Sequence, residues 1–349
     1  MQASTRPFGL LAALFALLCF ASMASAATYV RRGSDPSVIK MNNTFYSVES
    51  GAGGIWMRSA SSLVGLGANN VDRVNVWSDK AGRGEVWAPE LVEDGGKTWI
   101  LFSSGVASKH RMYAMSADHP MGPYTSETKI ALPDDQWAID GTMFNFNGER
   151  WFVWSGWEDG TGKEQNLYIC KMSSPTQSTG KRFIISQPRE PWETKVSGIN
   201  EGPEAIIDPN GQLHIVYSAN GSWTDRYCLA DLRLRKGGNP TYVWDWYKSN
   251  GCLFGSHQDG MMNGWDATLD VDGPGHHSFD MPNGDIKDSP GGTNHIGFSY
   301  HAVPKGTQYS WENRDVYAGT FVWWSKTTYS RKNVPGANND EGYSFKFFE

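Results

Sequence analysis

The feature that most limits the fold of this 349-residue chain is a short β-rich module that recurs five times. Each module begins with an opening segment, passes a turn, and continues through an aromatic strand into a third strand. The opening segments cover 35–39, 87–91, 139–144, 200–206 and 275–279. The turns that follow are Asn42-Asn43, Asp94-Gly95-Gly96, Asn147-Gly148, Asn210-Gly211 and Asn283-Gly284. Asn-Gly and Asp-Gly between β-rich runs favour tight hairpins, because such turns need positive φ angles.

Five small antiparallel sheets of similar length predict an all-β fold, a five-bladed β-propeller. A sheet of three or four strands cannot bury both faces alone, so the modules must stack around an axis. The alternative is a β-sandwich with accidental self-similarity, but module order, turn chemistry and spacing together favour the propeller. Because no Pro/Ser-rich linker separates the modules, we expect one domain over residues 27–349. Two stretches do not fit the module: 257–271, interpreted as a rim loop, and 326–349, interpreted as a terminal strand or tail.

The first 26 residues have the pattern of a secretory signal peptide. Arg6 precedes an apolar stretch over 8–20, and Ala24-Ser25-Ala26 forms a small-x-small cleavage site. The apolar stretch is too short for a transmembrane helix, so we expect a secreted, extracellular protein without a membrane partner. The net charge of −6, without a stripe of Lys or Arg, argues against nucleic acid as a partner.

Three cysteines remain after the predicted signal peptide. Cys228 and Cys252 flank one sheet-like module and could pair in an oxidising compartment, the alternative being two separate buried thiols. Cys170 lies within an apolar strand pattern and is expected to be a buried free thiol.

A polar residue occupies what looks like the same place in every opening segment: Asp35, Glu90, Asp140, Glu201 and His276. The innermost strand of each blade lines the channel of a propeller, so these side chains should converge. Asp and Glu are poor strand formers and are rarely buried unless they are paired or used. Converging carboxylates suit glycoside hydrolysis, because one must be protonated and another ionised, and crowding raises the pKa of one of them. The alternative is a set of carboxylates that binds a structural cation on the axis.

At these residues the chain resembles glycoside hydrolase family 43, inverting five-bladed propeller enzymes that act on arabinan and xylan. The resemblance rests on Asp35-Pro36, on Trp87-Ala88-Pro89-Glu90, on 137–142 and 200–204, and on Gly275-His276 followed by Ser278-Phe279. It implies that Asp35 is the general base, that Glu201 is the general acid, and that Asp140 raises the pKa of Glu201 and orients it. It also implies that Glu90 hydrogen-bonds substrate and that His276 contacts a cation on the axis, often calcium, or an ordered water network. The chemistry itself would require no cofactor.

Further segments, 154–158, 165–169 and 217–229, resemble the exo-acting α-L-arabinofuranosidase branch. That resemblance implies a monomer that releases L-arabinofuranose from arabinan or arabinoxylan. Trp87 and Trp157 are candidates for the pocket wall, and Arg314 resembles a fifth-blade arginine that binds substrate. A β-xylosidase or endo-arabinanase of the same family, and a non-catalytic carbohydrate-binding propeller, remain alternatives.

Inversion requires Asp35 and Glu201 to lie roughly 6.5–9.5 Å apart, so that a water fits between Asp35 and the sugar. The chain departs from the family pattern at His277, a second histidine beside His276, so the pattern does not say which imidazole faces the axis.

Overall fold

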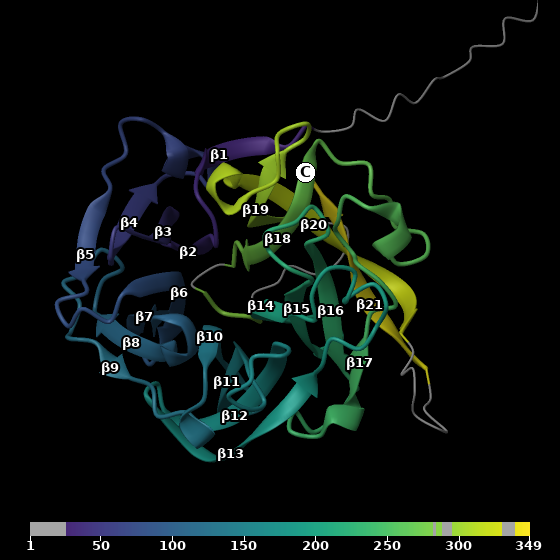
Figure 1. Cartoon of the computed structure of the whole chain (residues 1–349), viewed down its shortest axis with the longest axis horizontal. Helices are drawn as coiled ribbons and strands as arrows, with labels where there is room; N and C mark the ends of the chain where they lie inside the picture. The colour runs from purple at the N-terminus through teal and green to yellow at the C-terminus, as the bar shows by residue number, and fades with distance from the viewer. Residues whose placement is uncertain (1–25, 282–283, 288–294, 330–338) are drawn as a thin grey trace, which may run out of the picture.

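The computed structural model describes residues 26–281, 284–287, 295–329 and 339–349. Five antiparallel sheets surround a common axis (Figure 1), which confirms the prediction of an all-β, five-bladed propeller. The predicted signal peptide, apart from Ala26, and Asn283 of the predicted fifth turn lie outside the described residues. No helix within the described residues is long and apolar enough to cross a membrane.

Four blades each consist of four consecutive strands, paired in chain order. Blade one contains β2 (Ser37–Met41), β3 (Thr44–Gly51), β4 (Gly54–Ala60) and β5 (Val74–Ser78). Blade two contains β6 (Glu85–Asp94), β7 (Lys97–Gly105), β8 (Arg111–Ala117) and β9 (Thr128–Lys129). Blade three contains β10 (Ala138–Phe146), β11 (Glu149–Gly156), β12 (Asn166–Ser174) and β13 (Gln177–Ser186). Blade four contains β14 (Asn200–Ile207), β15 (Leu213–Ala219), β16 (Cys228–Leu234) and β17 (Trp246–Lys248).

The fifth blade joins the two ends of the chain. It contains β18 (Val271–Phe279), β19 (Ile296–Pro304) and the long β20 (Asp315–Tyr329). The N-terminal β1 (Thr28–Arg32) pairs with the first part of β20, and β21 (Asp340–Phe348) pairs with the rest of it. The ring is therefore closed by hydrogen bonds between the first and last parts of the domain.

Short 3₁₀ helices occur in the connections. Those in the described residues are η1 (Val64–Gly67), η2 (Ala107–Lys109), η3 (Pro133–Asp135), η4 (Val243–Asp245), η5 (Gln258–Gly260) and η6 (Trp311–Asn313).

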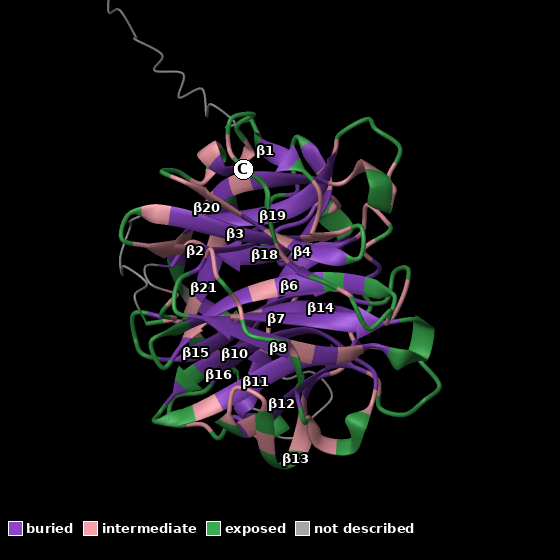
Figure 2. Ribbon diagram, turned by 90° about the vertical axis from the view of Figure 1, so that its left-hand side faces the viewer, coloured by how far each residue is buried: buried purple, intermediate pink, exposed green. Residues whose placement is uncertain are grey.

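Five clusters of buried apolar side chains fill the five interfaces between neighbouring blades. The strands of the blades are accordingly buried over most of their length (Figure 2). Strand β7 shows how the sequence achieves this. Successive side chains of a strand point to opposite faces, so Ile100 and Phe102 pack against blade one, whereas Leu101 packs against blade three. Because both faces of a blade are covered, its middle strands are apolar almost throughout. The smallest of the described clusters fills the interface between blades five and one, where the ring closes. Its residues are Val30, Val38, Phe45, Leu66 and Val316.

The inner strands of blades two to five each contain a β-bulge near the start. The register shifts lie between Trp87 and Glu90, Ile139 and Thr142, Glu201 and Glu204, and Gly275 and Ser278. A residue with positive φ begins each bulge, and Asp35 has the same conformation just before β2: Asp35 (48°), Ala88 (41°), Asp140 (53°), Gly202 (55°) and His276 (42°).

The bulges correct the alignment of the opening segments. Ala88 and Gly202, rather than Glu90 and Glu201, occupy the place taken by Asp35, Asp140 and His276 in the other blades. Glu201 precedes its bulge residue by one position, and Glu90 follows its own by two. A bulge inserts an extra residue without changing the residue types that make the strand recognisable, so the sequence pattern does not locate it.

The two stretches that did not fit the module contribute to the cluster between blades four and five. Residues 257–271, interpreted as a rim loop, do not line the central pocket described below. Trp265 of this stretch is buried, and its Nε1 donates to the Phe345 carbonyl, 2.7 Å away. The stretch 326–349 includes the end of β20 and β21, whose Phe345 and Phe347 belong to the cluster between blades four and five.

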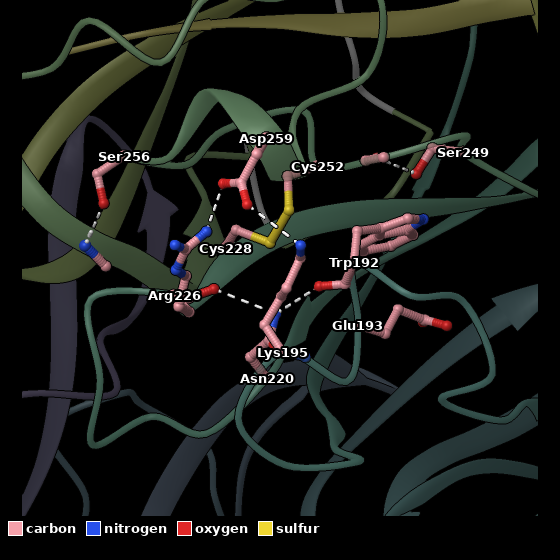
Figure 3. Close-up of a disulfide and its surroundings, with 12 residues drawn as sticks. Trp192, Glu193, Lys195, Asn220, Arg226, Cys228, Ser249, Cys252, Ser256 and Asp259 are labelled. Atoms are coloured by element: carbon pink, nitrogen blue, oxygen red, sulfur yellow. Dashed lines mark hydrogen bonds and ion pairs between the residues drawn. A yellow bond between two sulfur atoms is a disulfide. The ribbon is translucent and has the colours of Figure 1, made fainter.

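The cysteine predictions are confirmed. Cys228 and Cys252 form a disulfide (Figure 3), and Cys170 is a buried free thiol.

Candidate active site

A pocket of about 400 Å³ lies where the inner strands begin. It brings together Asp35 of blade one, Asp140 of blade three and Glu201 of blade four, which are far apart in the sequence. Its other lining residues are Glu85, Trp87, Ala88, Trp137, Ile139, Gln165, Ser222, Trp223, His276, Trp311 and Arg314. Asp35, Asp140 and His276 all have positive φ, a conformation that is costly for residues other than glycine and that clusters at functional sites.

Asp35 is held as an ionised carboxylate. Burial alone would raise its pKa, but His276, Arg314 and His301 hold the pKa well below its usual value. Its Oδ1 lies 3.2 Å from Nδ1 of His276 and 3.7 Å from Nη1 of Arg314. Arg314 carries a permanent charge, whereas a histidine contributes one only when protonated. The Asp35 side chain retains 20% of its exposure, which leaves it accessible to water.

Glu201 has the opposite character. Burial is the largest cause that raises its pKa, and the charge of Asp35 raises it further, to about 7 despite the hydrogen bond from Tyr227. The hydroxyl of Tyr227 donates to Oε1 of Glu201 at 2.9 Å. A carboxyl group with this pKa carries its proton over much of the neutral range and can deliver it to a leaving group.

Asp140 is the third carboxyl group of the pocket. Its Oδ2 accepts a hydrogen bond from the Gly202 amide at 3.1 Å, which fixes it beside the residue that follows Glu201. Burial, then the charges of Glu201 and Asp35, raise the pKa of Asp140 well above its usual value. Because each charge disfavours the other, Asp140 and Glu201 together keep at least one proton near neutral pH.

Of the two adjacent histidines, His276 faces the pocket. Its Nδ1 also lies 3.8 Å from Asp140, and burial lowers its pKa, so the ring is neutral at neutral pH. His277 is not among the pocket-lining residues, and burial, then His276, lowers its pKa to about 3.

The contact of His276 with an axial cation or an ordered water network, which the resemblance implies, stays a prediction. Nδ1 of His276 is directed at carboxylates of the pocket, and calcium prefers six to eight oxygen ligands. No group of three or more His, Cys, Asp or Glu in the described part of the chain is arranged to hold a metal ion. We therefore derive no step through a cation.

Glu90 does not line the pocket. It lies in a separate space of about 30 Å³, here called the axial cavity, which is also lined by Thr142 and Glu204 among apolar residues such as Leu91 and Phe279. The structure does not support the predicted hydrogen bond from Glu90 to substrate, because the bulge makes Ala88, two residues earlier, the residue that lines the pocket.

The position two residues after each bulge residue has a structural role instead. In three blades its side chain accepts a hydrogen bond from the backbone of the next blade. The Leu91 amide donates to Ser37 Oγ (2.8 Å), the Phe279 amide to Glu204 Oε2 (2.7 Å) and the Val38 amide to Ser278 Oγ (3.0 Å). Glu90 accepts from Thr142 Oγ1 at 3.4 Å. These contacts join successive blades around the axis.

The aromatic wall differs in one residue from the prediction. Trp87 lines the pocket and stacks on His110, with ring centroids 3.8 Å apart. Trp157 does not line it; Trp137 does, and Trp157 stacks behind Trp137 at 4.6 Å. The structure therefore places Trp137 rather than Trp157 in the pocket lining, because sequence spacing does not show which of two stacked indoles lines a pocket. Arg314 lies in the pocket as the resemblance implied.

Sequence reasoning also missed Tyr227, His301, Trp223 and Trp311. Tyr227 contacts Glu201, and the backbone amide of Asp35 donates to Nδ1 of His301 at 3.1 Å. The rings of Tyr227 and His301 stack at 5.5 Å, which links the surroundings of the two carboxyl groups. A histidine inside the otherwise apolar β19 was a usable signal. Trp223 and Trp311, also in the lining, are in connections and carried no such signal.

One ionised and one protonated carboxyl group in a partly open pocket can activate water on one side of a bond and protonate the departing oxygen on the other. These are the two protonation states that hydrolysis of a glycosidic bond requires, and the expected separation of Asp35 and Glu201 stays a prediction.

Comparison with known proteins agrees with this geometry. The family model described as "Glycosyl hydrolases family 43" matches residues 29–327. "Alpha-L-arabinofuranosidase 43" of Humicola insolens is 29% identical over 294 residues, which cover 80% of this chain and 58% of that protein. "Extracellular exo-alpha-(1->5)-L-arabinofuranosidase" of Streptomyces avermitilis is 30% identical over 258 residues, 70% of this chain and 51% of that protein. The chain thus spans little more than half the length of these curated relatives.

Among solved structures, an α-L-arabinofuranosidase from Lactobacillus brevis shares the fold, with a TM-score of 0.72 and 24% identity over 87% of this chain and 95% of that chain. The family match extends from β1 into β20 and so includes all five blades and the pocket. The chain belongs to glycosyl hydrolase family 43.

Proposed function

We propose that this protein is a secreted exo-α-L-arabinofuranosidase that hydrolyses its substrate with inversion at the anomeric carbon. The observation that carries the proposal is the opposite protonation of two carboxyl groups in one pocket. Asp35 is kept ionised beside Arg314, whereas the pKa of Glu201 is raised to about 7. The names of the relatives from Humicola insolens and Streptomyces avermitilis support the choice of sugar.

In the proposed reaction Asp35 removes a proton from a water molecule as the water oxygen attacks the anomeric carbon. The bond from that carbon to the leaving oxygen breaks, and Glu201 transfers its proton to this oxygen. Asp140 holds the Gly202 backbone beside Glu201 and disfavours early loss of the proton. Water thus supplies the hydroxyl group of the released sugar, and the carboxyl groups exchange their protonation states.

The substrate would be an arabinose-containing polysaccharide or oligosaccharide of the plant cell wall. Trp87 and Trp137 provide flat apolar surfaces for a sugar ring, and Arg314 provides a hydrogen-bond donor beside Asp35. Export would remove residues 1–26, and the mature protein would act as a monomer. N-terminal sequencing and light scattering of the protein recovered from culture medium test these two points.

A panel of substrates tests the activity. Rapid hydrolysis of aryl α-L-arabinofuranosides, slow hydrolysis of aryl β-D-xylosides and release of single arabinose units from debranched arabinan are the expected results. Faster xyloside hydrolysis would identify a β-xylosidase, release of oligosaccharides an endo-arabinanase, and binding without release a carbohydrate-binding propeller. Proton NMR of the first-formed anomer tests inversion.

A further inference from the structure

Two large apolar side chains at the pocket, Trp223 and Trp311, are exposed. Trp223 is 42% exposed and Trp311 is 53% exposed, and both line the pocket that contains Asp35 and Glu201. Their rings meet edge to face, with centroids 6.0 Å apart and an interplanar angle of 88°. Large apolar side chains left in water at a concave site are typical of a surface that binds a ligand.

The pair lies on the side of the general acid. Nε1 of Trp311 donates to Oγ of Ser222 at 3.3 Å. The Ser222 hydroxyl in turn lies close enough to Glu201 to lower its pKa by hydrogen bonding, against the larger effect of burial. Since the acid protonates the leaving oxygen, the leaving part of the substrate must lie on this side of the pocket.

The connection that carries Trp223 is fixed at both ends (Figure 3). At its start, the Asn220 side chain donates to the Trp192 carbonyl at 2.8 Å and accepts from the Lys195 amide at 3.0 Å. At its end, Arg226 is paired with Asp259, and the Cys228–Cys252 disulfide follows. A ring presented on an anchored segment loses little conformational entropy when a ligand binds.

Trp311 is fixed through its backbone. Its carbonyl accepts from Nε of Arg314 at 3.2 Å, and Arg314 is the residue that contacts Asp35. The indole side chain itself extends toward Trp223 and Ser222, so it can be removed without breaking the contact between its carbonyl and Arg314.

We propose that Trp223 and Trp311 form the platform for the leaving-group sugar, the residue of an arabino-oligosaccharide that is released when the terminal arabinofuranose is cleaved. The two rings are perpendicular and form a corner, so the apolar C–H face of that sugar stacks on one indole and its edge contacts the other, while the glycosidic oxygen points to Glu201. This assignment rests on the proposed function and extends it by naming the residues that distinguish a polymer end from a small leaving group.

The test compares two substrates that differ in the leaving group. α-L-Arabinofuranosyl fluoride has a single-atom leaving group that cannot reach the platform, whereas α-1,5-arabinotriose offers a sugar there. For Trp223→Ala and for Trp311→Ala, the ratio of kcat/KM for the trisaccharide to kcat/KM for the fluoride should fall about tenfold, the effect of losing one good stacking contact. Trp223→Phe should recover most of the ratio, because it restores an aromatic face.

Trp244→Ala is the matched control, because Trp244 is 44% exposed in η4 and is not among the pocket-lining residues. Its ratio should equal that of the wild type. An unchanged ratio in both pocket variants, whether neither substrate or both substrates equally are affected, would overturn the platform. A wild-type protein that hydrolyses neither substrate would instead overturn the proposed function, and the platform with it.

Discussion

The pocket and the axial cavity each contain buried carboxyl groups at the centre of the same ring of strands, but their charge states differ. In the axial cavity, burial raises the pKa of Glu90 to about 8 and that of Glu204 well above its usual value. Among the described lining residues of that cavity there is no Lys or Arg. In the pocket, Arg314 lies 3.7 Å from Asp35, and the pKa of Asp35 is lowered.

The difference shows what converts a cluster of acids into a candidate catalytic site. Burial alone gives neutral carboxyl groups that accept backbone hydrogen bonds and join neighbouring blades. A cation beside one member separates the pKa values, so that a base and an acid coexist at the same pH. The predictions below test this contrast between the two spaces.

The largest effect is expected for Asp35→Asn, compared with the matched neutralisation Glu90→Gln. Removal of the base should lower kcat about 10³- to 10⁴-fold on every substrate, the range for loss of a general base. Glu90→Gln should change kcat less than threefold, roughly within the spread of distant substitutions. Steady-state kinetics on an aryl α-L-arabinofuranoside measures both. A large loss in Glu90→Gln would place the axial cavity in the catalytic machinery.

Glu201→Ala should be selective for the leaving group. Hydrolysis of arabino-oligosaccharides should fall about 10²- to 10³-fold, because their leaving oxygen needs a proton. Dinitrophenyl α-L-arabinofuranoside should lose less than about tenfold, since its leaving group departs without one. Equal losses on the two substrates would contradict the assignment of Glu201 as the acid.

The pH profile of kcat/KM should depend on Arg314. In the wild type, activity should decline above a pH of about 7 as Glu201 loses its proton, and decline at low pH as Asp35 gains one. Arg314→Met removes the permanent charge among the groups that lower the pKa of Asp35, so the acid limb should move up by about one pH unit. Arg314→Lys keeps the charge and should restore the limb. An unmoved acid limb in the Met variant would show that another group titrates there.

The smallest effect concerns stability in the axial cavity. Glu90 has a folded-state pKa of about 8 against an ordinary value of 4.5, so the folded protein retains a proton that the unfolded chain releases. The associated stabilisation is complete below pH 4.5 and is lost as the pH rises through about 8. Glu90→Gln cannot lose a proton, so its stability should fall less than that of the wild type between these values. Thermal unfolding across this range measures the difference, and parallel curves for the two proteins would contradict the assigned protonation.

The repeat alone was sufficient to predict the five-bladed propeller, because turns and apolar strands are local properties and five agreeing modules restrict the topology. The sequence also predicted that Asp35, Asp140 and Glu201 are functional residues, because Asp and Glu are poorly suited to inner strands unless they are used. The disulfide could also be anticipated, since two cysteines flank one module of a chain with a predicted export signal.

Other features depended on how the strands are bent and packed. The bulge at Ala88 moves Glu90 into the axial cavity, and an alternating pattern does not locate a bulge. The stacking of Trp137 on Trp157 decides which indole faces the pocket, and the joining of separate connections brings Trp223 to Trp311. Local sequence therefore determined the modules and the acids, whereas the direction of each side chain was set by contacts between segments far apart in the chain.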